Sequence, residues 1–309
     1  MKMKKALIFG ITGQDGSYLA NHLIKKKYKV FGFSRKKNFK NLKKLNIFKL
    51  VKIYSYKKNI NKILIKNFDE IYFLGGQSNV LKSFNNHDLT YSSQIQPIIS
   101  VLEFIRNQKK KSKFLYASSS EIFGNFKSHL KKNEKSFKQP ISPYGLSKLI
   151  GFEIINSYRE MFKLPVCSEI FFNHESPLRS KGYVVKKIID YVKNSKKEKK
   201  LELGNINIKR DWGWGPEFIK ACNKILSKNK IDDYIIASGK TTSLKEIIKK
   251  IFLIKNLNYK KYININNKKI RKFDISQNYA DISKIKKKIK WKPRYNLDKI
   301  IYKMYNNEY

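Results

Sequence analysis

The sequence has little cysteine and no long apolar run, and each absence excludes a class of protein. The only cysteines, Cys167 and Cys222, lie far apart and have no histidine at metal-ligand spacing. Neither a disulfide framework nor a metal site is therefore expected, and a reducing compartment fits best. Only four apolar residues separate the N-terminal lysines from Gly10, and no other run approaches the roughly 18 residues of a membrane-spanning helix. We expect a cytoplasmic protein that neither is exported nor enters a membrane.

Acidic residues are also scarce, with 23 Asp and Glu against 68 Lys and Arg, for a net charge of +45. Such a charge raises the question of a nucleic-acid partner. The excess is nearly all lysine, is spread along the whole chain, and comes with abundant Asn, Ile, Tyr and Phe, which have AT-rich codons. We therefore attribute it to genomic base composition and expect no nucleic-acid partner. Runs such as 109–113, 196–200 and 286–288 are interpreted as solvated helix ends and loops.

The first half of the chain alternates strand and helix patterns. A short apolar run ends in a glycine cluster, and Tyr18, Leu19, Leu23 and Ile24 then share one face of a helix. Such alternation predicts an α/β fold with a doubly wound, parallel Rossmann sheet. The expected strands are 6–9, 28–33, 70–74, 113–117 and 165–171, with helices at 97–107 and 144–162 between them.

Beyond about residue 172 the pattern is less regular, with helical stretches at 184–193, 216–226 and 243–251. The chain is long enough for a large α/β domain with an appended lobe. Residues 1–172 are therefore predicted to form the Rossmann domain. Residues 173–309 are predicted to form mainly a smaller C-terminal substrate-binding lobe, with some segments returning to the Rossmann sheet.

A glycine cluster follows the first predicted strand. Gly10, Gly13 and Gly16 form G-x-x-G-x-x-G at the junction of that strand with a helix. The missing side chains let backbone N–H groups approach a pyrophosphate at the helix N-terminus, so this turn is predicted to bind a dinucleotide. The residues assigned to the cofactor here are Gly10, Thr12, Gly13, Gln14, Asp15 and Gly16.

The end of the second predicted strand indicates which dinucleotide binds. A Rossmann domain that prefers NAD usually carries an acidic residue there, for the ribose 2′-hydroxyl. This chain has Ser34 followed by Arg35 and Lys36. A guanidinium and an ammonium suit a 2′-phosphate, so we predict NADP. The alternative is that these cations are simply more of the chain's many basic residues.

A tyrosine and a lysine stand four residues apart at the start of a predicted helix. This spacing places Tyr144 and Lys148 on one helix face, where the lysine cation can favour the tyrosinate and make the phenol a proton acceptor. About 25 residues earlier, a strand ends in a hydroxyl cluster that contains Ser119 and is followed by Glu121. The alternative for these polar residues is an ordinary turn after a strand. Together with the glycine cluster, the set instead predicts a dehydrogenase-type catalytic site.

Several segments resemble the GDP-mannose 4,6-dehydratase family, within the extended short-chain dehydrogenases, and they occur in the family's order over almost the full length. The most specific are Gly-Ile-Thr-Gly-Gln-Asp-Gly, Asn-His-Glu-Ser-Pro and Arg-Asp-Trp-Gly. The matching segments are 6–19, 74–80, 142–148, 172–177, 203–205 and 210–213.

The resemblance implies a hydro-lyase that converts GDP-mannose to GDP-4-keto-6-deoxymannose by internal hydride transfer through bound NADP. Tyr144, assisted by Ser119, would take the proton of the sugar 4-hydroxyl, and Lys148 would hold the nicotinamide ribose. Glu121 would remove the C5 proton and help water leave from C6. Ser119 stands where the family usually has threonine, which keeps the hydroxyl.

The resemblance also implies contacts to the GDP-hexose. Of the four residues implied, Lys186 stands where the family has an arginine, whereas the other three are of the residue type that the family has. His174 is interpreted as a buried structural histidine, and Trp212 and Trp214 as packing residues. The substrate-binding residues implied are Asn173, Lys186, Arg210 and Arg271.

The chain is shorter than the family after the second strand, and the acidic signature expected near residues 54–56 to contact the adenine is missing. Because the longer loop helps family members share NADP sites between subunits, a homodimer is expected, with a homotetramer as the alternative. Two rival functions stay open. One is a GDP-4-keto-6-deoxy-sugar reductase or nucleotide-sugar epimerase on the same fold, which would have no use for Glu121. The other is a basic nucleotide- or RNA-binding protein, which would need an RNA module that the sequence does not show.

Overall fold

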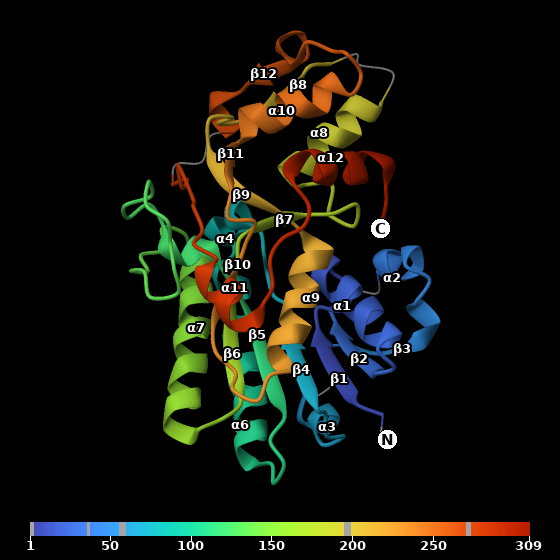
Figure 1. Cartoon of the computed structure of the whole chain (residues 1–309), viewed down its shortest axis with the longest axis vertical. Helices are drawn as coiled ribbons and strands as arrows, with labels where there is room; N and C mark the ends of the chain where they lie inside the picture. The colour runs from blue at the N-terminus through green and yellow to red at the C-terminus, as the bar shows by residue number, and fades with distance from the viewer. Residues whose placement is uncertain (1–2, 36–37, 56–59, 195–198, 270–272) are drawn as a thin grey trace.

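The computed structural model describes residues 3–35, 38–55, 60–194, 199–269 and 273–309 (Figure 1). Within these ranges, seven strands form one sheet in the order β10-β6-β5-β4-β1-β2-β3, and every neighbouring pair is parallel. The predicted doubly wound Rossmann sheet is thus confirmed. The strands are β1 (Lys5–Phe9), β2 (Lys29–Ser34), β3 (Val51–Ser55), β4 (Glu70–Phe73), β5 (Lys113–Ser119), β6 (Val166–Phe171) and β10 (Tyr234–Ile236).

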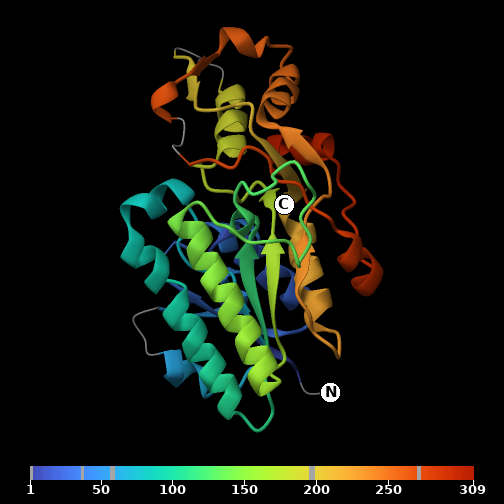
Figure 2. The same cartoon turned by 90° about the vertical axis from the view of Figure 1, so that its left-hand side faces the viewer.

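Helices cover both faces of the sheet (Figures 1 and 2). On one face, α1 (Gln14–Lys25) and α9 (Gly215–Leu226) share an apolar core with the strands. On the other, α3 (Ile60–Leu64), α6 (Ile95–Asn107) and α7 (Pro143–Phe162) enclose a second core. Because both faces are buried, the strands are apolar on both sides, as expected of a parallel sheet. The short helices α2 (Lys40–Lys44), α4 (Val80–Asn85) and α5 (His87–Ser92) lie in the connections.

A smaller lobe lies beyond the C-terminal ends of the strands (Figure 1). Its helices α8 (Val184–Lys193), α10 (Leu244–Leu253) and α12 (Leu297–Asn306) enclose a third apolar core. One small sheet has the order β11-β9-β7, from Thr241–Ser243, Lys209–Trp214 and Asn173–Glu175. The other pairs β12 (Ile263–Ile265) with β8 (Leu201–Leu203).

Some segments beyond residue 172 belong to the Rossmann sheet rather than to the lobe. Strand β10 pairs with β6, α9 packs against α1, and α11 (Ser283–Ile289) packs against β10. The chain therefore crosses between the two parts several times, and the division at residue 172 stays a prediction. No helix in the described part of the chain has both the length and the apolar character needed to cross a bilayer.

One carboxylate is buried in the sheet without a charged or N–H partner. Glu169 on β6 is 0% exposed, and among the residues that the structure describes only the Cys167 thiol, a weak donor, lies beside its carboxylate. Burial, followed by the nearby carboxyl of Asp233, raises the pKa of Glu169 well above its usual value. Asp233 is itself held by Arg159 through two contacts of 2.6 Å. An ionised Glu169 therefore opposes folding.

We predict that Glu169→Gln raises the free energy of unfolding at pH 8 by about 1–3 kcal/mol, because Gln is neutral at every pH, whereas Glu169 must take up a proton or bury a charge when the chain folds. The folded-state pKa lies above the unfolded value of about 4.3, so the wild type is fully stable below that pH and loses stability as the pH rises through the folded pKa. Melting temperatures measured from pH 4 to pH 8 should nearly coincide at pH 4 and diverge above it. A gap that does not change with pH would contradict this assignment.

Candidate active site

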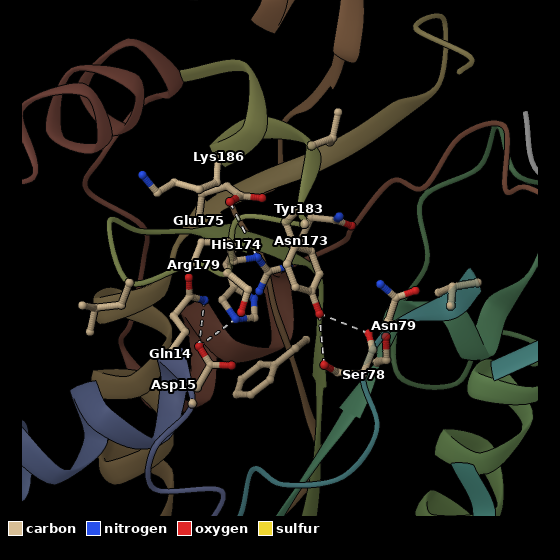
Figure 3. A pocket seen from close by; sticks show the side chains of 18 of the residues that line it. Gln14, Asp15, Ser78, Asn79, Asn173, His174, Glu175, Arg179, Tyr183 and Lys186 are labelled. Atoms are coloured by element: carbon tan, nitrogen blue, oxygen red, sulfur yellow. Dashed lines mark hydrogen bonds and ion pairs between the residues drawn. The ribbon is translucent and has the colours of Figure 1, made fainter. Parts of the chain in front are cut away.

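A cavity of about 960 Å³ lies at the C-terminal ends of the parallel strands, between the sheet and the lobe. This edge of an open parallel sheet is where such folds bind ligands. Residues from the glycine turn, from the ends of β2, β4 and β5, and from the lobe all line it. Figure 3 shows the part of this cavity where the glycine turn meets the lobe.

The glycine turn brings the N-terminus of α1 against the end of β1. Gly10 has φ +82°, and a Cβ on Gly16 would lie 2.2 Å from the carbonyl oxygen of Gly10. Neither position can therefore carry a side chain without moving the backbone. Thr12 Oγ1 lies 2.9 Å from Ser34 Oγ, which ties the turn to the end of β2. The turn has the geometry expected of a pyrophosphate cradle.

Gln14 and Asp15, both predicted cofactor residues, also join this turn to the lobe. Asp15 Oδ1 lies 2.9 Å from His174 Nε2, and Ser176 Oγ donates to Gln14 Oε1 at 2.8 Å. Burial alone would raise the pKa of Asp15, but His174 above all, together with Arg179, holds it down at about 2. Asp15 is thus a stable anion beneath the cavity. It holds His174 of the lobe in place.

His174 is a structural residue, as the sequence indicated. Its ring is 7% exposed, Nδ1 lies 2.8 Å from the carbonyl oxygen of Phe172, and Nε2 faces Asp15. Both ring nitrogens are therefore engaged by protein groups. The histidine connects β7 to the glycine turn.

The end of the cavity next to β2 is basic. Arg35 is exposed and lines the cavity, and Lys40 and Lys44 of α2 line the same end. Lys36, the other cation predicted to contact the cofactor, lies outside the described residues. Asn41 of α2 donates to the carbonyl oxygen of Thr12 at 3.2 Å, which holds this helix beside the glycine turn.

The predicted catalytic residues come together at the ends of β5 and α7. Ser142 caps α7 by accepting a hydrogen bond from the backbone N–H of Gly145 at 3.0 Å, and Tyr144 and Lys148 follow on the first turns. Lys148 Nζ donates to the carbonyl oxygen of Ala117 at 2.7 Å. Ser119 ends β5, Glu121 lies in the 3-10 turn that follows, and all four predicted catalytic side chains line the cavity.

Burial shifts the pKa values of Tyr144 and Lys148, the two residues that share one face of α7. Burial raises the pKa of Tyr144, although a hydrogen bond from Ser119 and the charge of Arg179 act in the opposite direction. Burial also lowers the pKa of Lys148 to about 7. Burial thus disfavours the charged forms of both side chains. The hydrogen bond from Ser119 and the charge of Arg179 act on Tyr144 in favour of the tyrosinate.

The predicted substrate residues that the structure describes line the same cavity from the lobe. Asn173 lies on β7, Lys186 on α8 and Arg210 on β9. Both cations have acidic neighbours, because Arg210 Nη2 contacts Asp274 at 2.9 Å and Lys186 is paired with Asp190. Arg271 lies outside the described residues.

The Arg-Asp-Trp-Gly segment on β9 is mostly architectural. Asp211 is buried and accepts hydrogen bonds from the backbone N–H groups of 238–239 at 2.7 and 2.6 Å. Trp212 Nε1 donates to the carbonyl oxygen of Thr242 at 3.1 Å, and Trp214 lies in the apolar core of the lobe. The expected packing role of both tryptophans is confirmed, although Trp212 also lines the cavity.

Three residues of the cavity wall were not singled out from the sequence. Arg179 Nε lies 3.7 Å from Glu175 Oε2, and its guanidinium lies 3.8 Å from the centre of the Tyr183 ring. The Tyr183 hydroxyl in turn lies 3.0 Å from the Ser78 hydroxyl (Figure 3). Ser78 and Arg179 lie within or just beyond segments that resemble the family. Nothing in the residue types alone distinguished them.

Across the described ranges, no three or more His, Cys, Asp or Glu side chains are grouped so that they could hold a metal ion. The polar groups that line the cavity include hydroxyls, carboxylates and cations.

The amino-acid sequence of the chain is similar to those of a known enzyme family. The sequence profile described as GDP-mannose 4,6 dehydratase matches residues 7–304. GDP-mannose 4,6 dehydratase 1 of Arabidopsis thaliana is 33% identical over 330 aligned residues, covering 99% of this chain and 90% of the relative. The GDP-mannose 4,6-dehydratase of Vibrio cholerae serotype O1 is 36% identical over 265 residues, covering 80% of this chain and 71% of the relative.

Solved structures agree on the fold. A dTDP-glucose 4,6-dehydratase from Bacillus anthracis, in complex with NAD, has a TM-score of 0.86 at 18% identity, covering 98% of this chain and 96% of the other. A UDP-glucuronic acid 4-epimerase from Bacillus cereus, in complex with UDP-glucuronic acid and NAD, has a TM-score of 0.88 at 22% identity, covering 98% of each chain. At these identities the likeness extends to the fold alone.

We predict that Lys148→Met stabilises the protein near pH 7, because a buried ammonium is replaced by an apolar side chain of similar length. The folded-state pKa of about 7 lies below the unfolded value of about 10.4. The stability of the wild type should therefore rise relative to the variant as the pH increases from 7 to 10. The difference in melting temperature between Lys148→Met and the wild type should become smaller over this range. For the same substitution at the exposed Lys249, that difference should not change with pH. A gap that widens with pH would refute the assignment.

Proposed function

The chain belongs to the GDP-mannose 4,6-dehydratase family of nucleotide-sugar hydro-lyases, and we propose that it removes water from GDP-mannose in this cavity, using NADP held by the glycine turn. The observation that carries the proposal is the presence of Glu121 beside Ser119, Tyr144 and Lys148. An oxidoreductase or 4-epimerase on this fold needs the tyrosine and the lysine but has no step for such a carboxylate.

Tyr144 and Glu121 each have a proton to move in this proposal. Tyr144 acts as the tyrosinate, which the hydrogen bond from Ser119 and the charge of Arg179 favour, and accepts the proton of the sugar 4-hydroxyl as C4 becomes a ketone. The ketone acidifies the C5 proton, which Glu121 removes, and Glu121 then protonates the C6 hydroxyl so that it leaves as water. Bound NADP would accept the hydride from C4 and return it to C6, so that no net oxidation occurs. The proton that Tyr144 took from the 4-hydroxyl is returned to C5, directly or through Glu121, and completes GDP-4-keto-6-deoxymannose.

The residues present fit a dinucleotide. Backbone crowding at Gly10 and Gly16 leaves room only for glycine, as a close approach to a pyrophosphate requires. Arg179 adds a buried cation on the lobe side of the turn, and we propose that it contributes to holding the diphosphate of the dinucleotide. The relatives of known structure were solved with NAD. For this chain we propose NADP, because the cations Arg35, Lys40 and Lys44 line the end of the cavity beside β2.

The lobe end of the cavity is proposed to hold the GDP moiety. Asn173 and Lys186 would contact the diphosphate region, and Arg210, together with Arg271, would neutralise its charge. Arg210 would then be shared between the nucleotide and Asp274, which already holds its guanidinium in place.

The setting of the protein is also part of the proposal. The buried cysteines Cys167 and Cys222 are both free thiols, as suits the cytoplasm. A homodimer is proposed, with a homotetramer as the alternative, because the chain is short after β2. No nucleic-acid partner is proposed.

We predict that the purified protein supplied with NADP converts GDP-mannose to a product lighter by one water, without net consumption of the cofactor. Mass spectrometry of the nucleotide sugar, with absorbance at 340 nm for reduced cofactor, measures both. Intact GDP-mannose after prolonged incubation would count against the function. Steady accumulation or loss of NADPH would favour the reductase alternative.

Glu121→Gln is the matched variant for this assay. It preserves the size of the side chain but cannot accept a proton, so water loss should fall by about 10²–10⁴-fold while the affinity for GDP-mannose stays within about twofold. Full activity in the variant would assign the base elsewhere.

We predict that Arg35→Ala weakens NADP binding by about tenfold or more and leaves NAD binding almost unchanged, because a charge-assisted hydrogen bond to the 2′-phosphate is lost. Calorimetric titration of both dinucleotides measures the ratio of affinities. Arg106→Ala, which removes a surface arginine paired with Glu103 on α6, is the control for general loss of positive charge. Equal affinity of the wild type for NAD and NADP would overturn the cofactor assignment.

A further inference from the structure

A tyrosine of the lobe reaches across the cavity to the Rossmann side. Tyr183 lies directly before α8, and its hydroxyl oxygen is 3.0 Å from the Ser78 hydroxyl. The same phenol donates to the carbonyl oxygen of Ser78 at 3.3 Å. Ser78 belongs to the connection between β4 and α4. Figure 3 shows the two side chains meeting over the cavity that both of them line.

The ring of Tyr183 is held in place before any ligand arrives. The Arg179 guanidinium lies 3.8 Å from the ring centre, within the range of a cation–π interaction. Arg179 is itself anchored by the carboxylate of Glu175, at 3.7 Å. Because the phenol is already ordered, using its hydroxyl to bind a ligand costs little conformational entropy.

The phenol also lies near the reaction centre. Tyr183 and Tyr144 line the same cavity, and Tyr183 is close enough to raise the pKa of Tyr144. In the proposed function, Tyr144, Ser119 and Glu121 act on C4, C5 and C6 of the hexose. None of them has a task at C2 or C3, so the hydroxyls there need other partners.

The hydroxyls of Tyr183 and Ser78 suit that need. Each can donate one hydrogen bond and accept others, and so can the hydroxyl of a sugar. A sugar hydroxyl placed between them would replace their mutual contact with two new ones. The loss of the existing bond would therefore be offset, and the sugar would be held in the cavity that Tyr144 also lines.

We propose that Tyr183 is a positioning and specificity residue for the hexose, whose hydroxyl binds, together with Ser78, a ring hydroxyl at C2 or C3 of the sugar. The proposal rests on the proposed function, since it takes a GDP-hexose as the substrate. It assigns Tyr183 to the sugar rather than to the nucleotide. A deoxy sugar without that hydroxyl would leave the Tyr183–Ser78 pair without its ligand.

Tyr183→Phe tests the proposal because it keeps the ring against Arg179 and removes only the hydroxyl. In protein loaded with NADPH, which cannot accept the hydride and so does not turn GDP-mannose over, the dissociation constant for GDP-mannose should rise by roughly two- to tenfold, the net value of one hydrogen bond. The dissociation constant for GDP, which has no sugar, should stay within the error of the calorimetric titration. Tyr158→Phe, which removes a phenol bonded to Glu103 on the outer face of α6 and α7, is the matched control.

The Ser78→Ala and double variants test whether the two hydroxyls act together. If they hold one sugar hydroxyl between them, the double variant should lose less affinity than the product of the two single losses. GDP-2-deoxymannose and GDP-3-deoxymannose identify the hydroxyl. One of these two deoxy sugars should bind the wild type as weakly as GDP-mannose binds Tyr183→Phe. The Tyr183→Phe variant should bind the two deoxy sugars with equal affinity.

The outcomes separate this inference from the proposed function. Equal weakening of GDP and GDP-mannose by Tyr183→Phe, or no change in either, overturns the sugar contact. These binding measurements need no turnover, so they judge Tyr183 whether or not water is lost. A wild type that removes water from GDP-mannose and a Tyr183→Phe variant with unchanged affinity would leave the function standing and refute only the role of Tyr183.

Discussion

Asp15 and His174 join the two halves of the molecule through a contact of 2.9 Å, and the arrangement of the cavity depends on it. Asp15 belongs to the glycine turn that crowds against the end of β1, whereas His174 belongs to the strand that opens the lobe. The strand continues through the loop that carries Arg179 and Tyr183. The glycine turn is therefore tied directly to the lobe, and the two lie on either side of one cavity.

Burial shifts the pKa values of several side chains of the site. It raises the pKa of Tyr144 and of Glu175, and it lowers the pKa of Lys148 to about 7. Burial thus disfavours the charged forms of all three groups, so neighbouring charges and hydrogen bonds decide their protonation. Arg179, by contrast, stays cationic and is supported by Glu175 and stacked on Tyr183. It supplies a positive charge that favours the ionised form of Tyr144.

Much of the site could be predicted because its parts are local in the chain. The glycine turn, the spacing of Tyr144 and Lys148 on one helix, and Glu121 just after its strand all depend on secondary structure that short segments specify. The parallel sheet then brings the ends of its strands to one edge. Burial, which opposes the charged forms of Tyr144 and Lys148, could not be predicted in this way because it depends on the packing of distant segments.

The sequence by itself determined the fold class, the strand-to-helix turn for the cofactor and the catalytic helix, since each follows from apolar periodicity and residue spacing within short stretches. Only the tertiary structure decided that β10 and α9 return to the sheet, that Asp211 anchors a distant turn, and that Tyr183 meets Ser78 across the cavity. These contacts join residues far apart in the chain. Their formation depends on how three separate apolar cores pack, which no local pattern records.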